Sequence, residues 1–373
     1  MSPKEAKVPV QNPFTPTFGV VPLYMAGREE LVEELSGAFA NGIGDPNLST
    51  IISGPRGTGK TALLSFMAGE ASSQGWVCAN VTAADGMLED ILDQATIAAR
   101  DFLESLGGKK LTGITIGQFI GFEWENSAPR AGTWRTQMSA LLDQLAENDV
   151  GLLITVDEVK VDIDEMKQLA RVYQHFVREN RKVALLMAGL PYATSALLAD
   201  DDVSFLRRAR KHTLGRIPDN QIRDAMAMTI ADGGRAISAE ALDEAVAAVD
   251  GFPYMMQLVG YRMWAENPAN EEISLADVSH GVKLAQEEMV DGVLEYTYRD
   301  LSKGDRRFLA AMLPDAEASS LADVAERMGV KSNYASQYKR RLLEQGVIGE
   351  PQKGYVRFEL PMFREYLEMR VKG

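Results

Sequence analysis

A glycine-rich segment near the N-terminus has the residue types and the spacing that bind phosphate. It follows the apolar run 49–53, precedes a helix-compatible stretch, and consists of Gly54, Pro55, Arg56, Gly57, Thr58, Gly59, Lys60, Thr61 and Ala62. Glycines let consecutive backbone N–H groups surround a β-phosphate, and the following helix adds its positive N-terminal end. Lys60 would reach the β- and γ-phosphates, and the Thr61 hydroxyl would ligate Mg²⁺. These nine residues therefore predict a site for a nucleoside triphosphate with Mg²⁺.

Two carboxylates follow a second apolar run about a hundred residues further on. Residues 151–156 would form a buried strand, which Asp157 and Glu158 follow. We expect this strand to lie beside the strand before the glycine-rich loop, so that its carboxyl end faces the γ-phosphate. Asp157 would then hold Mg²⁺ through water, and Glu158 would activate the attacking water as a general base. Three more acidic residues are expected to form only a solvated helix start: Asp162, Asp164 and Glu165.

Length and composition indicate a globular protein of more than one domain. A chain of 373 residues is long for one core, so two or three domains are expected. No apolar run approaches the roughly 20 residues that span a bilayer, and no signal-peptide pattern opens the chain. We therefore expect a cytoplasmic protein with no membrane partner. The single cysteine, Cys78, excludes an internal disulfide, and the three histidines lack metal-ligand spacing.

Charge is distributed unevenly along the chain. The net charge of −14 argues against non-specific coating of nucleic acid. Residues 301–373 nevertheless hold 13 Lys or Arg against 10 Asp or Glu, a net charge of +3, so the other 300 residues carry −17. The C-terminal segment is therefore electrostatically distinct from the rest of the chain.

Five apolar strand candidates alternate with helical patterns. They occupy residues 49–53, 77–81, 151–156, 182–188 and 211–217. The alternation predicts an α/β fold with a five-stranded, doubly wound parallel sheet that helices cover on both faces. A partial alternation in residues 111–122 indicates an added hairpin. After Pro218 the pattern is helical, over residues 220–231, 238–249 and 253–264, which predicts a helical lid.

The expected domain organisation follows from these patterns. We predict an extended lead-in at 1–20, an α/β domain at 21–217, the lid at 218–270, a bridging helix at 271–300 and a C-terminal domain at 301–373. That last segment shows helix-turn-helix spacing, with helices at 321–328 and 332–345 separated by Gly329, which permits a left-handed helix end. A hairpin at 347–360 follows, and the whole resembles a winged helix.

The second of these helices predicts a DNA-contacting face. Ala335, Tyr338 and Leu342 would face the core of the domain. The outward cations and amides, with Lys353 at the tip of the hairpin, are Lys331, Asn333, Gln337, Arg340 and Arg341. Such groups suit base edges and phosphates in the major groove of double-stranded DNA. The alternative is a winged helix that contacts protein or acts as a rigid cover.

Taken together, these motifs resemble the AAA+ class of P-loop NTPases, and more narrowly its archaeal-ATPase, STAND and origin-recognition-initiator branch. Gly27-Arg28-Glu29 matches the start of such modules, residues 54–61 the Walker A motif and residues 152–158 the Walker B motif. Gly251-Phe252-Pro253 resembles the G-x-P of STAND lids. The resemblance implies that the nucleotide is ATP and that residues 23–27 and the lid enclose the adenine, with Gly27 and Pro253 among the contacts.

Two departures from the family pattern concern catalysis. Residues 187–191 fall at the sensor 1 position without an obvious Asn or Thr, and Arg262 is the nearest candidate for a sensor 2 arginine. We therefore expect tight nucleotide binding with slow or partner-stimulated hydrolysis. Arg208, in the basic cluster 205–211, would by the same likeness reach the γ-phosphate of a neighbouring subunit and so require self-association. A basic helix end that suits the helix dipole is the alternative.

The sequence thus supports two functional hypotheses. In the first, an ATPase couples its nucleotide state to the binding of double-stranded DNA by the C-terminal winged helix. In the second, a signalling switch of STAND type uses the winged helix to regulate the nucleotide module or to contact a protein partner. Stimulation of ATP turnover by DNA would favour the first, and DNA-independent nucleotide exchange triggered by a protein would favour the second.

Overall fold

A computed structural model describes residues 11–17, 19–105, 133–160 and 162–372. The chain divides into two compact units. The sheet unit contains Glu30–Ser53 and Lys60–Thr213, and the lid unit contains the segment up to Glu29, the loop Gly54–Gly59 and the chain from Leu214 onward. The hairpin expected at 111–122 and the first half of the expected lead-in lie outside the described residues. The finer division into five segments stays a prediction.

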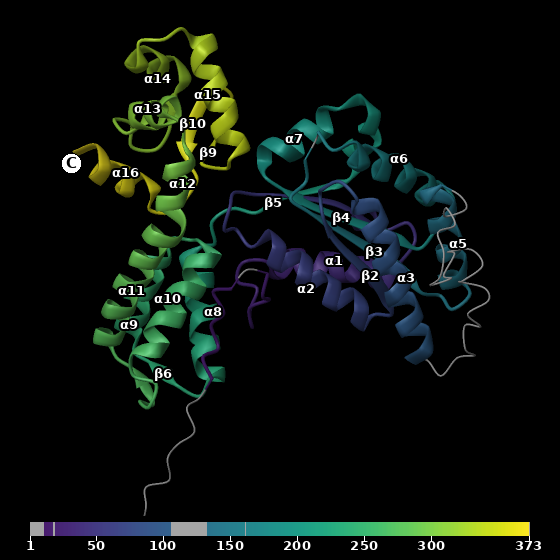
Figure 1. The fold of residues 1–373 in the computed structure, drawn as a ribbon. Coiled ribbons are helices and arrows are strands. Elements are labelled where there is room, and N and C mark those ends of the chain that lie inside the picture. The colour runs from purple at the N-terminus through teal and green to yellow at the C-terminus, as the bar shows by residue number, and fades with distance from the viewer. Residues whose placement is uncertain (1–10, 18, 106–132, 161, 373) are drawn as a thin grey trace, which may run out of the picture. The chain divides into compact units, whose positions relative to one another are not determined.

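The sheet unit is built on five parallel strands (Figure 1). They are β1 (Ser49–Ser53), β2 (Trp76–Thr82), β3 (Gly151–Asp157), β4 (Val183–Gly189) and β5 (Arg210–Thr213). The strand order is β2-β3-β4-β1-β5, and every neighbouring pair is parallel. The predicted fold class is therefore confirmed. One strand is shorter than expected, because β5 ends at Thr213 and the chain from Leu214 onward belongs to the lid unit.

Helices cover both faces of this sheet, which explains its near-continuous apolar strands. On one face, alternate strand residues such as Ile154 join a core with α3 (Met87–Ser105), α5 (Trp134–Ala146) and α6 (Asp164–Arg178). The opposite face is covered by α2 (Lys60–Ser73), which contacts β2, β3 and β4. The remaining helices of this unit are α1 (Glu29–Asn41), α7 (Pro191–Ala199) and the short 3-10 helices Pro46–Leu48 and Asp201–Arg208.

The strand order corrects one expectation about the site. We expected β3 to lie beside β1, and this is wrong because β4 pairs with both of them. A strand that comes later in the sequence has been inserted between the two. The alternation of strands and helices gives no information on such insertions, since each crossover can skip a position. The site therefore depends on α2, whose second residue is Thr61, to bring a side chain close to the end of β3.

The lid is a group of helices that begin where the sequence predicts. It contains α8 (Asp219–Asp232), α9 (Ala239–Val249) and α10 (Pro253–Glu266). A further helix, α11 (Leu275–Met289), falls in the segment expected as a bridging helix and packs against α10 and α9. The Ser238 side chain caps α9 by accepting from the backbone N–H of Ala241, and Pro253 occupies the first turn of α10. A parallel pair of two-residue strands, β6 (Ala236–Ile237) and β7 (Glu272–Ile273), was not predicted, because strands so short show no periodicity.

The chain continues from the lid into a C-terminal module at residues 301–372. A π-helical turn (Val290–Leu294) joins α11 to α12 (Glu295–Asp300). The module contains α13 (Lys303–Met312), α14 (Leu321–Met328), α15 (Ser332–Glu344) and α16 (Phe363–Lys372). Its three strands are β8 (Ser319–Ser320), β9 (Ile348–Gly349) and β10 (Tyr355–Phe358), antiparallel in the order β8-β10-β9. Gly329 ends α14 in the left-handed conformation, at a φ of +67°. None of the described helices is both long and apolar enough to cross a membrane.

Candidate nucleotide-binding site

The backbone conformation of the glycine-rich loop depends on its glycines. Gly57 and Gly59 have φ values of +78° and +83°, in the region that L side chains rarely adopt. Thr58 is buried, and its hydroxyl donates a hydrogen bond to the Pro55 carbonyl at 2.8 Å. A Cβ on Gly54 would lie only 2.7 Å from the Leu214 carbonyl oxygen. The loop is therefore closed on itself, and two of its glycines cannot be replaced without strain.

The loop leads directly into α2, whose first two residues are Lys60 and Thr61. The first N–H groups of a helix lack partners within the helix, and its N-terminal end carries partial positive charge. Both features suit a phosphate at this point.

The structure brings Thr61 and Asp157 together. The Thr61 hydroxyl donates a hydrogen bond to Oδ2 of Asp157 at 2.5 Å, although β4 separates β3 from β1. A hydroxyl beside a carboxylate is an oxygen donor pair that fits Mg²⁺, which binds through few protein oxygens and keeps several waters. These two residues would therefore hold the ion that accompanies a nucleotide.

Glu158 follows Asp157 in a conformation unusual for a residue other than glycine. Its φ is +51°, and its backbone N–H donates to Oδ1 of Asp157 at 2.8 Å. The left-handed conformation costs roughly 1 kcal/mol, and such strain clusters at functional sites. Val159 then donates to the Ala188 carbonyl at 2.9 Å, which fixes the chain after the turn. The exposed Glu158 carboxylate is thus held at the end of β3 by the backbone on either side of it.

Glu165 differs from its expected role in a solvated helix start. Its carboxylate accepts from the backbone N–H groups of Gly86 at 2.9 Å and Leu88 at 2.8 Å. These N–H groups lie at the beginning of α3, so Glu165 caps that helix. The cap comes from a separate helix, and no local sequence pattern reports it.

Gly27 and Pro253, expected on the adenine side, both lie in the lid unit. A Cβ on Gly27 would lie 2.9 Å from atoms of both Ile217 and Gln221, so its backbone packs directly against the start of α8. Pro253 approaches the loop, because a Cβ on Gly59 would lie 3.8 Å from the Pro253 Cβ. The Arg28 guanidinium donates to the Gly215 carbonyl at 2.8 Å, and burial lowers its pKa.

At both candidate sensor positions the structure shows contacts that are made within the protein. Arg262 donates from Nε to Glu288 Oε2 at 2.8 Å, so this candidate is engaged by the neighbouring helix α11. After β4, the Thr194 hydroxyl donates within its own turn, to the carbonyls of Leu190 and Pro191, each at 3.2 Å. Slow hydrolysis stays a prediction.

The two arginines of the basic cluster differ in their contacts. Arg207 is anchored, because its Nε donates to the Leu198 carbonyl at 2.9 Å and it pairs with Asp201. Arg208 is exposed at the end of the 3-10 helix, and among the described residues its side chain has no hydrogen bond or ion pair. Arg208 is therefore the cluster's candidate for a contact with a second molecule.

The residues expected to contact DNA fall into two groups. Five are exposed on α15 or in the turn between β9 and β10, namely Lys331, Asn333, Gln337, Arg340 and Lys353. Arg341, in contrast, pairs with Asp305, which is 2% exposed, and donates to the Ser302 hydroxyl at 3.1 Å. Ser302 and Asp305 form a capping box at the start of α13, a pattern that the sequence contains at the required spacing. Arg341 therefore joins α15 to α13.

Arg56 makes a contact that no sequence pattern indicated. Its Nε donates at 2.9 Å to the carbonyl of Gln345, a residue 289 positions away in the same unit. Gln345 is the C-cap of α15, and the last carbonyls of a helix favour a cation. A side chain of the phosphate loop thus contacts the end of the helix expected to bind DNA.

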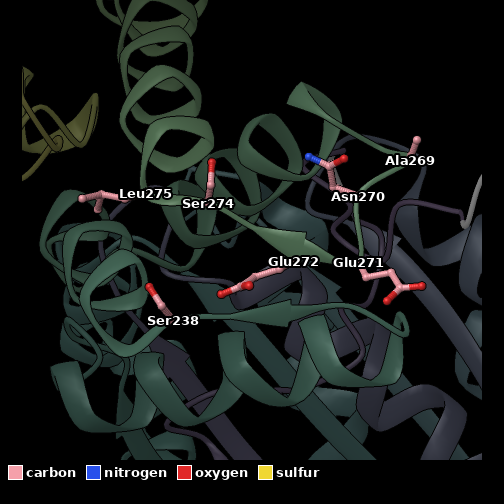
Figure 2. Close-up of a pocket in the computed structure, with 7 residues that line it drawn as sticks. All are labelled: Ser238, Ala269, Asn270, Glu271, Glu272, Ser274 and Leu275. Atoms are coloured by element: carbon pink, nitrogen blue, oxygen red, sulfur yellow. The ribbon is translucent and has the colours of Figure 1, made fainter.

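A surface hollow in the lid is separate from these groups (Figure 2). Its lining residues are Ser238, Ala269, Asn270, Glu271, Glu272, Ser274 and Leu275. Two carboxylates disfavour a phosphate there, and none of the residues expected at the nucleotide or DNA site lines the hollow.

Comparison with solved structures defines the fold. A Walker-type ATPase of Pyrococcus abyssi aligns with a TM-score of 0.64 and 14% identity over 92% of this chain and 96% of that chain. The ORC2 protein of Aeropyrum pernix, solved as ADPNP-ADP complexes, aligns with a TM-score of 0.61 and 15% identity over 96% of this chain and 97% of that chain. The chain has the AAA+ P-loop fold.

Two further comparisons concern sequence. A family model described as a domain of unknown function (DUF8462) matches residues 291–367. The match begins within the π-helical turn and ends within α16. It therefore covers the C-terminal module and little else of the chain. No curated protein sequence matches the chain significantly.

Proposed function

We propose that this AAA+ chain is an ATPase that couples its nucleotide state to the binding of double-stranded DNA by the C-terminal module. The observation that carries the nucleotide part is the hydrogen bond between Thr61 and Asp157 at 2.5 Å, directly after a glycine-rich loop with phosphate-binding spacing. Its test is an ATP hydrolysis assay with Mg²⁺, with and without DNA. Turnover that DNA stimulates supports the proposal, and absence of any turnover in both conditions contradicts the ATPase assignment.

Each residue of the site has a defined role in this reaction. The backbone N–H groups of the loop and the N-terminus of α2 bind the β-phosphate, and Lys60 balances charge on the β- and γ-phosphates. Thr61 and Asp157 would hold Mg²⁺, and the ion would supply positive charge beside the transferred phosphoryl group. Glu158 orients the attacking water and accepts its proton. Gly27 and Pro253 contact the adenosine end of the nucleotide.

We interpret the C-terminal module as a winged helix. The order α13, β8, α14, α15, β9, β10, with an antiparallel sheet, supports this interpretation. The first residues of α15 would then enter the major groove, with Lys331 and Asn333 exposed at its start. Lys353, in the turn between β9 and β10, would contact phosphate.

The salt dependence of DNA binding tests this interface. Replacing Lys331 and Lys353 with Ala should weaken DNA affinity and flatten its dependence on salt, because each lost phosphate contact reduces the log–log slope by about 0.9. Lys283→Ala, which removes an exposed lysine from α11, is the matched control and should keep the wild-type slope. Equal slopes in the double variant and the wild type would remove these residues from the interface.

Arg56 offers a direct route from the nucleotide to the module. In the structure its Nε donates to the Gln345 carbonyl. A bound triphosphate would compete for the guanidinium, since a negatively charged phosphate oxygen attracts the cation more strongly than the neutral Gln345 carbonyl does. Loss of the Gln345 contact would then change how α15 is held, and with it the affinity for DNA.

Arg208 gives a prediction about assembly. If Arg208 reaches the γ-phosphate of a neighbouring subunit, Arg208→Ala should hydrolyse ATP poorly while its own nucleotide site stays intact. Mixing it with Lys60→Ala, which keeps the arginine, should restore turnover. Arg210→Ala, an exposed neighbour in β5, serves as control. Normal turnover by Arg208→Ala, at a specific rate independent of protein concentration, would contradict a contact between Arg208 and a neighbouring subunit. The basic cluster would then have only a structural role.

A signalling switch of STAND type remains the second candidate. The observation that favours it is the ion pair between Arg262, the sensor 2 candidate, and Glu288. Because this pair engages Arg262, we expect ATP hydrolysis to be slow. In this case the module would contact a protein partner, and the nucleotide would exchange rather than turn over. Nucleotide release that a protein accelerates and DNA does not affect would support it.

A further inference from the structure

The segment at residues 11–28 contacts the lid at three separate places. The first is the ring of Phe14, which packs against the helix α10. Phe14 is 1% exposed, and a Cβ on Gly260 of α10 would lie 2.2 Å from Phe14 Cδ1. The ring therefore occupies the space in which any other residue at position 260 would carry its side chain.

Backbone and side-chain hydrogen bonds fix the segment on either side of this ring. The Thr15 N–H donates to Gln257 Oε1 at 2.9 Å, and the Asn12 side chain donates to the Tyr261 carbonyl at 3.0 Å. Both acceptors lie on α10, as does Gly260. The segment is thus docked on this one helix by Asn12, Phe14 and Thr15.

The other two contacts lie on α8 and just before it. The Tyr24 hydroxyl donates to Asp232 Oδ2 at 2.5 Å, at the last residue of α8. Gly27 then packs against Ile217 and Gln221, near the beginning of that helix. Figure 1 shows the segment in purple beside the lid helices, and both belong to the lid unit.

We propose that residues 11–17 and 19–28 act as a strap whose Phe14 anchor positions Gly27 for the adenine end of the nucleotide. Phe14 is a positioning residue, since it acts through Gly27 and does not itself touch the ligand. The inference rests on the proposed binding of ATP. It goes further because it attributes part of the affinity for the adenine base to the docking of Phe14 on α10. The side-chain amide of Gln221 lies beside Gly27 and is partly exposed, and an amide suits the polar edge of a purine base.

The strap should contribute to the affinity for the base of the nucleotide and not to the affinity for its phosphates. The loop, Lys60 and the N-terminus of α2 would bind the phosphates, and none of the strap contacts described above involves these groups. Phe14→Ala should therefore raise the dissociation constant for ATP by about tenfold or more, because it lowers the fraction of molecules with the strap docked. The dissociation constant for inorganic tripolyphosphate should stay unchanged. Lys60→Ala should weaken both.

A second variant reaches the same contact from the lid. Gly260→Ala adds a Cβ within 2.2 Å of the ring and should displace Phe14, with the same loss of ATP affinity and the same unchanged tripolyphosphate affinity. In the double variant F14A/G260A the ring is absent and the Cβ fits. The loss of ATP affinity in the double variant should be no larger than that in either single variant. The effects of the two substitutions should therefore not add. Phe14→Leu, which keeps apolar volume, should recover part of the affinity.

Calorimetric titration of the full chain with ATP and with tripolyphosphate decides between the outcomes. Wild-type ATP affinity in both single variants overturns the strap, as do equal losses for the two ligands, because a general loss of structure would cause them. Additive losses in the double variant also overturn it. If Phe14→Ala does not fold, Gly260→Ala and Phe14→Leu give the same comparison. Failure of the wild type to bind ATP overturns the proposed function, and the inference with it.

Discussion

Glu158→Gln is expected to keep its affinity for Mg²⁺-ATP and to lower ATP turnover by about 10² to 10⁴, the contribution of a general base. The amide has nearly the shape of the carboxylate but cannot accept a proton from the attacking water. Binding should persist because Thr61 and Asp157, which are hydrogen-bonded to each other, are unchanged. The backbone turn at φ +51° should also persist, since it does not depend on the side-chain charge.

Single-turnover hydrolysis and a binding titration on the same preparation measure the two quantities separately. Glu165→Gln is the matched control, because Glu165 follows the same strand but caps α3 through the N–H groups of Gly86 and Leu88. It should bind and hydrolyse ATP almost as the wild type does. Wild-type turnover by Glu158→Gln would place the base elsewhere, with Asp164 the next residue to replace.

Lys60→Ala should weaken ATP binding by at least about 1.5 kcal/mol, or roughly tenfold, because it removes a charge-assisted hydrogen bond to the phosphates. Lys60 is the first residue of α2, so Ala retains the helix and the N–H groups of its first turn. The loss should therefore come from the missing ammonium alone.

Isothermal titration with ATP gives this loss directly. Lys283→Ala removes the same charge from an exposed site on α11 and should bind ATP with wild-type affinity. An unchanged ATP affinity in Lys60→Ala would contradict the assignment of the phosphate loop. A loss shared equally by the two variants would instead show an effect of net charge.

The parallel sheet was predictable because its central strands β3 and β4 are buried on both faces. An apolar run such as β3, followed by Asp157 and Glu158, identifies both a strand and the edge at which its chemistry lies. The strand order was not predictable, since the insertion of β4 between β1 and β3 depends on how crossovers pack in three dimensions. The proximity of Thr61 to Asp157 follows from α2 and from no sequence period.

The contacts that sequence patterns missed are those between distant segments. Arg341 was expected to face outward from its helical position, and its helix face is exposed, but the buried Asp305 of α13 binds its guanidinium. Phe14 lay in a proline-rich stretch without periodicity, and Gly260 in a helix where glycine has no local purpose. Only the three-dimensional structure shows that the ring requires the glycine.

The most direct test of the central claim is a salt-titrated measurement of double-stranded DNA binding by the intact chain, with and without Mg²⁺-ATP. We predict that the wild type binds DNA with a steep salt dependence and that ATP changes its affinity. Lys60→Ala should bind DNA with an affinity that ATP no longer changes. No detectable DNA binding by the wild type at low salt, or the same affinity with and without ATP, would contradict the coupling of nucleotide state to DNA.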